Sequence, residues 1–197
     1  MRKASLIILL ILLCIAIFLG IAVLKRPLLR IAFLNVGAGD AILVTSPSGN
    51  TLLIDGGPDQ SVLQALGREI PFYVRSIDSV LATSQKSSDT GGLPFIIERF
   101  NAGVFIDSGL SPKTTTYRTL LDEVSQKNIP HVIADNGFDI DLGDGANFLI
   151  MSSGAEITGK IIYGNTSVSV PADVPAFSAS STDDIVFESD GINIWKK

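Results

Sequence analysis

The chain has 197 residues, enough for one domain, and a formal net charge of −5 at pH 7. Its single cysteine, Cys14, excludes an internal disulfide and a site with several thiolate ligands. Its single histidine, His131, excludes a metal site built from several imidazoles.

An uncharged, mostly aliphatic run opens the chain at residues 4–24 and contributes much of the high mean hydropathy of +0.40. As a helix this run would extend over about 31 Å, which is one hydrocarbon core of a bilayer. It is longer than the apolar part of a signal peptide, and no small-residue cleavage site follows it. We predict a basic head over residues 1–3, an uncleaved transmembrane helix over residues 4–24 and a linker over residues 25–28.

Residues 29–197 are predicted to form one acidic domain. All 20 acidic residues of the chain lie beyond the apolar run. An acidic domain repels the phosphates of nucleic acids, and no run of lysine and arginine compensates for this charge. We therefore expect no nonspecific nucleic-acid binding.

The order of the predicted elements is typical of a layered α/β domain with mixed sheets. Three strands joined by tight turns come first, strands and helices then alternate, and short strands follow. The predicted strands are 29–36, 40–45, 51–55, 78–83, 104–107, 130–134, 138–142, 146–151, 159–164, 166–170, 184–188 and 192–195; the predicted helices are 61–69, 93–100 and 114–127. The segment 171–183, rich in proline, alanine and serine, is predicted to be flexible.

Three motifs follow one another in the first half of the domain. Residues 33–40 read FLNVGAGD, residues 52–58 read LLIDGGP, and residues 80–94 hold a strand followed by SQKSSDTGG. Together they resemble the metallo-β-lactamase fold as found in the ComEC-type competence (DNA-uptake) proteins. The sequences GDG at 143–145 and YGNTS at 163–167 are similar to later hallmarks of that family. The resemblance implies an αββα sandwich, here with a reduced second half, because that family's later ligand segments are missing.

The same resemblance identifies the place of a metal loop. Ser84 and Lys86 stand where the family has its first two histidine ligands. Ser88 stands at the position of the loop aspartate, and Asp89 at that of the third histidine. A lysine ammonium at such a position repels a cation. The resemblance therefore implies that the zinc or manganese site has been lost, and we predict no catalytic residue and no cofactor.

Asp40, Asp55 and Asp89 remain as weak candidates for holding a hard cation such as Mg²⁺ through oxygen ligands. Asp40 and Asp55 occupy turn positions, where carboxylates usually bind backbone N–H groups instead. The serines beside Lys86 show no catalytic triad pattern. His131 is interpreted as a residue at the edge of a strand or on the surface.

Two functions from different classes stay open. The first is a membrane-anchored, noncatalytic protein that acts in binding or assembly, with a protein partner or a second copy covering sheet surface exposed by the reduction. The second is a residual metal-dependent phosphodiesterase or nuclease, which the resemblance implies. A decayed chain without a selected role is a third interpretation. Because the family's hydrolase domain acts outside the cytoplasm, we expect a single-pass membrane protein with an extracytoplasmic domain.

Overall fold

The computed structural model describes residues 11–14, 28–152, 156–170 and 184–197. Residues 11–14 are helical and exposed. The remainder of the apolar run at 4–24, together with the segment 171–183 that was predicted to be flexible, lies outside the described residues. Within the described ranges, no helix combines the length and the apolar character needed to cross a bilayer.

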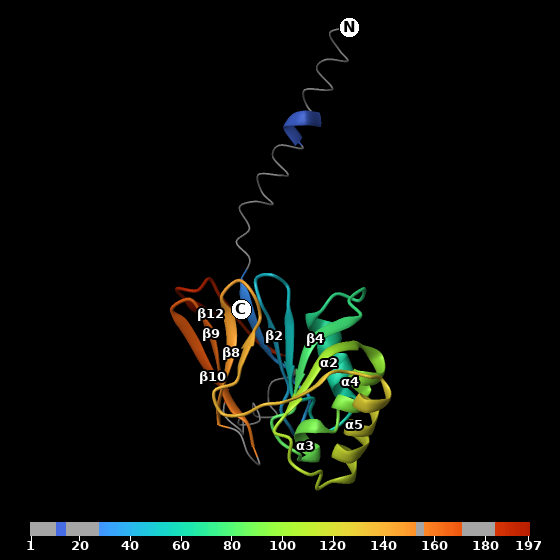
Figure 1. The fold of residues 1–197 in the computed structure, drawn as a ribbon. Coiled ribbons are helices and arrows are strands. Elements are labelled where there is room, and N and C mark those ends of the chain that lie inside the picture. The colour runs from blue at the N-terminus through green and yellow to red at the C-terminus, as the bar shows by residue number, and fades with distance from the viewer. Residues whose placement is uncertain (1–10, 15–27, 153–155, 171–183) are drawn as a thin grey trace.

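A mixed eight-stranded sheet forms the centre of the domain, in the order β12-β11-β1-β2-β3-β4-β5-β6 (Figure 1). Its strands are β1 (Leu29–Phe33), β2 (Ile42–Thr45), β3 (Thr51–Ile54), β4 (Ser76–Leu81), β5 (Asn101–Asp107), β6 (His131–Ile133), β11 (Ile185–Ser189) and β12 (Ile194–Lys196). The first three strands pair antiparallel, which confirms the predicted meander. From β3 to β6 the pairing is parallel.

This pairing gives the sheet two distinct ends. Strands β1, β3, β4, β5 and β6 all run in the same direction. We call the end at which these strands begin the entry end, because the chain enters the domain there at β1. The opposite end, where they finish, is the far end. In Figure 1 the entry end is uppermost and the far end, with α3, is at the bottom.

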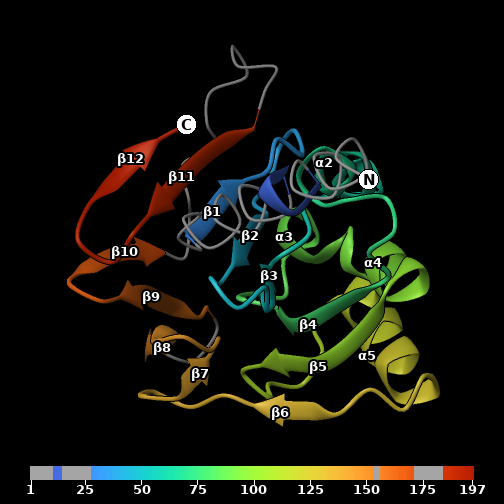
Figure 2. The same cartoon turned by 90° about the horizontal axis from the view of Figure 1, so that it is seen from above.

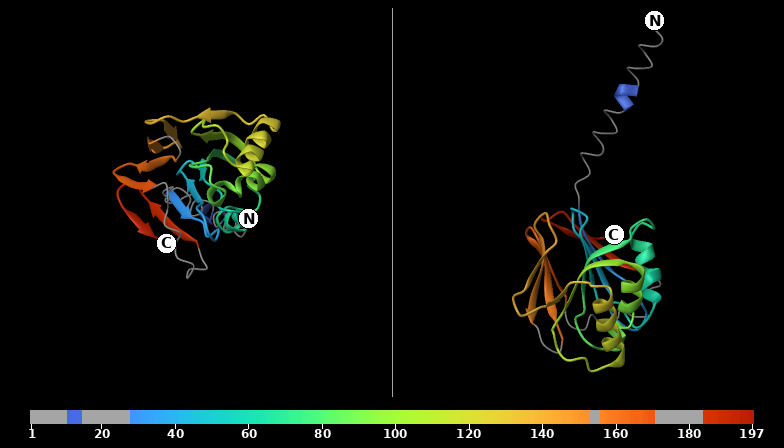
Figure 3. Two further views of the ribbon diagram at one scale, coloured as in Figure 1. Left: turned by 90° about the horizontal axis from the view of Figure 1, so that it is seen from below. Right: turned by 45° about the vertical axis from the view of Figure 1, so that its right-hand side comes forward.

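Helices cover one face of the large sheet (Figures 2 and 3). They are α2 (Ser61–Glu69), α4 (Leu93–Arg99) and α5 (Thr115–Gln126), and the short α3 (Ser87–Thr90) precedes α4. Pro94 lies in the first turn of α4, where its missing N–H would have no partner within the helix. At the start of α5, the Thr114 hydroxyl accepts a hydrogen bond from the Tyr117 amide, which caps the helix.

A second, antiparallel sheet packs against the other face of the large sheet, in the order β10-β9-β8-β7. Its strands are β7 (Asp139–Asp141), β8 (Ala146–Ser152), β9 (Thr158–Tyr163) and β10 (Thr166–Val170). The α/β class predicted from the sequence is confirmed. Among the described residues no helix covers the outer face of this small sheet, so these residues form three layers rather than the four of an αββα sandwich.

Two hydrophobic cores follow from the layering, one on each face of the large sheet. Neighbouring residues of a strand point to opposite faces. Leu53, Val80 and Phe105 therefore pack toward the helices, whereas Leu52, Leu81 and Ile106 pack toward the small sheet. All six side chains are almost completely buried. Coverage on both faces explains why the central strands are apolar along nearly their whole length.

Candidate functional site

The four positions that the resemblance assigns to a metal loop lie at the far end of the large sheet, Ser84 and Lys86 in the connection between β4 and α3, and Ser88 and Asp89 in α3. Hydrogen bonds attach this connection and its continuation to the turn that follows β3. The Gly56 amide donates to the Asp89 carbonyl over 2.7 Å, and the Gly92 amide donates to the Gly57 carbonyl over 2.9 Å. Two segments about 35 residues apart in sequence are thereby held side by side.

Two glycines make this close approach possible. A Cβ atom on Gly91 would lie 2.1 Å from the Pro58 carbonyl oxygen, and one on Gly92 would lie 2.0 Å from the Gly56 carbonyl oxygen. Both contacts are shorter than any real Cβ contact, and both are made with backbone atoms. The Gly-Gly pair of the third motif is therefore required by packing, not only by the turn it marks.

The buried Asp89 carboxylate is the centre of a hydrogen-bonded group. Its Oδ2 accepts from the Ser84 hydroxyl over 2.6 Å, and its Oδ1 accepts from the Ser88 hydroxyl over 2.7 Å. The backbone amide of Lys86 donates to the Ser84 Oγ over 3.1 Å. Three of the four positions that the resemblance assigns to ligands are thus joined through their side chains, and each Asp89 oxygen has a donor.

Lys86, the fourth position, connects the loop to the small sheet. Its Nζ lies 2.7 Å from Oε1 of Glu156, just before β9, in a partly exposed ion pair. Next to Glu156, the Ile157 amide donates to the Thr83 carbonyl over 2.6 Å. An exposed ion pair contributes less than about 1 kcal/mol to stability. The ion pair holds the ammonium group of Lys86 close to the connection into β9.

Asp55 follows β3 in the left-handed conformation, with φ +58°, and its side chain is buried. Oδ1 accepts from the Thr83 amide over 2.9 Å, and the Thr83 hydroxyl donates to Oδ2. Burial raises the pKa of Asp55 from 3.8 to about 8, against the two bonds from Thr83, and the charges of Asp89 and Asp40 raise it further. The carboxylate thus binds a backbone N–H group, as expected for an aspartate at a turn, and this group belongs to Thr83 on the loop after β4.

Asp40 lies just before β2, half-buried, and its carbonyl accepts from the Gly57 amide over 2.9 Å. Its charge and that of Asp89 both act on Asp55, so the structure brings the three cation candidates into one neighbourhood. Within the described residues, however, no three His, Cys, Asp or Glu side chains are arranged to hold a metal ion.

A second buried polar group at the far end was missed by the sequence reasoning. Asp107, the last residue of β5, is 1% exposed. Its Oδ2 accepts from the Tyr117 hydroxyl, its Oδ1 accepts from the Gly109 amide over 2.8 Å, and Nε2 of His131 lies 2.9 Å from Oδ1. Burial raises the pKa of Tyr117, so its hydroxyl stays protonated. His131 begins the edge strand β6, as interpreted from the sequence.

The Tyr117→Phe variant is expected to lose about 1.5–3 kcal/mol of stability, because a buried hydrogen bond to a charged carboxylate disappears while the ring remains. His131 is about one-third exposed. His131→Gln should therefore cost less than about 1 kcal/mol. Urea unfolding followed by circular dichroism measures both values. Equal losses for the two variants would contradict this expected difference between the contacts of Tyr117 and His131 with Asp107.

No protein-family model matches the chain, and no curated protein matches it. The solved structures to which it is similar include metallo-β-lactamases. A metallo-β-lactamase from Cronobacter sakazakii with a HARLDQ motif is 16% identical, with 71% of this chain and 55% of that one covered and a TM-score of 0.46.

Two further structures show a similar relation. A B3 metallo-β-lactamase with an active-site glutamic acid is 16% identical, covering 71% of this chain and 57% of that one, with a TM-score of 0.49. Zn²⁺-bound PqqB from Methylobacterium extorquens is 18% identical, covering 66% of this chain and 47% of that one, with a TM-score of 0.46. The chain spans about half the length of these three proteins.

Proposed function

We propose that the chain is a single-pass membrane protein whose degenerate, ComEC-like domain acts in binding or assembly and not in hydrolysis. One observation carries the proposal. The residues at the former ligand positions use their polar atoms on one another and on Glu156. Ser84 and Ser88 donate to Asp89, and Lys86 pairs with Glu156.

These residues do not fit the zinc or manganese centre that the fold family implies. Such a centre needs several imidazole and carboxylate ligands at about 2.0–2.2 Å from the metal. Asp89 already accepts a hydroxyl hydrogen on each oxygen, and the Lys86 ammonium brings positive charge to the loop. Burial keeps Asp55 protonated up to about pH 8, which weakens it as a ligand. We derive no hydrolytic step through a metal.

The same contacts give the far end a structural role. Asp55 links the ends of β3 and β4 through Thr83, and Lys86 and Thr83 link that loop to the connection into β9. A rigid scaffold of this kind suits a binding module, since binding surfaces on fixed elements lose less entropy when they are occupied. The partner is either another protein or a second copy of the chain, and the domain lies on the extracytoplasmic side.

Metal content tests the noncatalytic assignment directly. The full chain is purified in detergent without chelator, supplied with Zn²⁺ and Mn²⁺, and its bound metal is measured by mass spectrometry. We expect far less than one ion per chain, and the same value for Asp89→Ala. One or two tightly held ions, lost in Asp89→Ala and accompanied by phosphodiesterase activity, would instead support the residual hydrolase.

A further inference from the structure

Large apolar side chains are exposed at the entry end, away from the candidate site. The three most exposed ones in the described part of the chain are Phe72 at 87%, Tyr73 at 69% and Ile192 at 68%. Phe72 and Tyr73 lie in the turn between α2 and β4, with their rings edge to face at 5.6 Å. Ile192 lies in the turn between β11 and β12, which reaches the same end because Ser189 pairs with Leu29.

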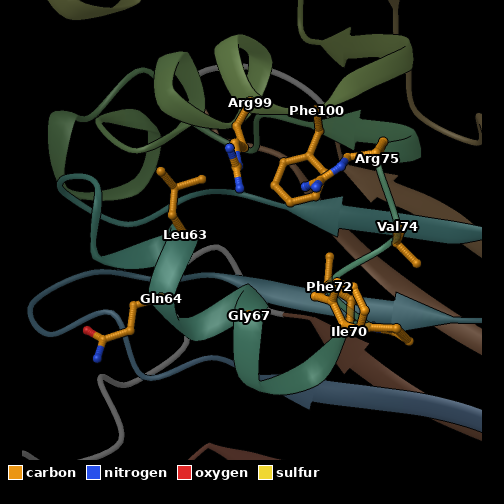
Figure 4. Close-up of a pocket in the computed structure, with 10 residues that line it drawn as sticks. Leu63, Gln64, Gly67, Ile70, Phe72, Val74, Arg75, Arg99 and Phe100 are labelled. Carbon is orange, nitrogen blue, oxygen red and sulfur yellow. The ribbon is translucent and has the colours of Figure 1, made fainter.

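A pocket of ≈ 550 Å³ adjoins Phe72, between the last turns of α2 and α4 (Figure 4). Arg75 and Arg99 lie together beside Phe100 on its wall. Both arginines are exposed, and among the described residues neither guanidinium has a hydrogen-bond or ion-pair partner. Two uncompensated cations on a chain of net charge −5 form a local exception to its acidic surface.

Two acidic groups of the entry end have other partners in the fold. Glu69, at the end of α2, pairs with Arg30. Asp190 accepts hydrogen bonds from the backbone amides of Ile192 and Asn193. The entry end therefore combines exposed apolar side chains with free positive charge, a combination suited to the boundary between water and lipid.

The length of the chain before β1 places this end close to a bilayer, if the proposed membrane anchor holds. The apolar run ends at residue 24 and β1 begins at Leu29. The five Cα–Cα steps between these residues, even fully extended, reach no more than about 18 Å. The first residues of β1, and the turns beside them, are then held within that distance of the lipid headgroups.

We infer that the entry end docks onto the lipid headgroup layer of the membrane that holds the anchor. Phe72, Tyr73 and Ile192 enter the interfacial region, where aromatic rings are favoured. Arg75 and Arg99 bind lipid phosphates, for which the planar guanidinium provides paired donors. The inference rests on the membrane anchoring in the proposed function, and it directs the far end, with Asp55 and Asp89, away from the bilayer.

Quenching by brominated lipids tests the docking. The full chain, carrying Trp195→Phe, is reconstituted into vesicles of phosphatidylcholine and phosphatidylglycerol with bromine on the upper acyl chain. Phe72→Trp reports from the entry end, and Leu110→Trp, which follows β5, is the matched probe at the far end. We expect several-fold stronger quenching of the Phe72→Trp protein. Equally weak quenching of both proteins would overturn the docking.

Charge variants test the role of the arginines. In the Phe72→Trp background, Arg75→Gln with Arg99→Gln should reduce the quenching. Lys113→Gln with Arg118→Gln removes the same charge from the far end and should leave the quenching unchanged. Equal effects of the two pairs would overturn the assignment of phosphate binding to Arg75 and Arg99.

Flotation and carbonate washing separate this inference from the anchor on which it rests. A chain that leaves the vesicles under carbonate lacks the anchor, and the proposed function fails with it. A chain that stays, but shows the Phe72→Trp probe unquenched, keeps the anchor and loses only the docking. Retention together with selective quenching supports both.

Discussion

Replacing Gly92 by alanine is expected to destabilise the domain by about 3 kcal/mol, the upper part of the usual range for overpacking. The added Cβ would lie 2.0 Å from the Gly56 carbonyl oxygen and 2.6 Å from that of Asp59. Both oxygens belong to the backbone of the turn after β3, so a side-chain rotation cannot relieve the overlap. The segment carrying Asp89 must then move away from the turn carrying Asp55.

Gly67→Ala is the matched control for this variant. Gly67 lies in α2, and a methyl group added to it would have no contact within 4 Å outside its own helix. Alanine there should stabilise the domain by about 0.5–1 kcal/mol, because it favours the helix. Urea unfolding measures the change in unfolding free energy of each variant, which should be a loss for Gly92→Ala and a gain for Gly67→Ala. A loss below about 1 kcal/mol for Gly92→Ala would contradict the tight packing of the two segments.

Asp55→Asn is expected to remove a fall in stability that the unchanged protein shows as the pH rises. The pKa of Asp55 is about 8 in the folded chain, mainly because of burial, against an ordinary value of 3.8. Asparagine keeps the size of the side chain and tolerates the left-handed backbone at this position. Its amide can donate to the Thr83 hydroxyl, which then accepts instead of donating.

The sign follows from proton binding. Between pH 3.8 and about 8 the folded state holds the Asp55 proton and the unfolded state has released it. The stability that Asp55 contributes is complete below pH 3.8 and is lost as the pH rises through about 8. The slope is at most about 1.4 kcal/mol for each pH unit, and it disappears in Asp55→Asn.

Asp59→Asn provides the control of opposite sign. The pKa of exposed Asp59 is lowered by the hydrogen bond from the Ser61 amide, so its contribution is present above its ordinary value of 3.8 and is lost in acid. Between pH 3.8 and about 8, the free energy of unfolding should therefore fall with rising pH in Asp59→Asn, as in the unchanged protein. In Asp55→Asn this fall should be absent. The same slope in all three proteins would show that Asp55 is ionised in the fold.

The sequence predicted the secondary structure well because strands and helices here carry clear local signals. The helix at 61–69 has the bounds of α2, and the predicted meander has the pairing of β1, β2 and β3. Turns rich in glycine and asparagine separated the C-terminal strands. β5 begins earlier than the predicted 104, at Asn101, because asparagine, alanine and glycine, which open it, are all uncommon in strands. The four-residue α3 was missed because so short a helix shows no periodicity.

The candidate site could be predicted only as a set of positions. The motifs located Ser84, Lys86, Ser88 and Asp89, but hydrogen bonds between residues distant in sequence were not accessible to local reasoning. Thr83 binds Asp55 across 28 positions. Asp107 gave one signal, a carboxylate at the end of an apolar strand, and its partners come from α5 and β6. Contacts between side chains on elements distant in sequence can be predicted only when the arrangement of those elements is known.

The pairing of β1 with β11 determines the order in which the molecule can be completed. Arg30 lies opposite Glu188, so β1 cannot form this pairing until the ribosome has synthesised β11. At a translation rate of about 5–20 residues per second, the delay between the synthesis of β1 and that of β11 is on the order of ten seconds. Throughout it, one edge of β1 offers unpaired backbone groups to other extended chains. A nascent chain that stalls before residue 185 keeps this edge open, and aggregation through β1 is its expected fate.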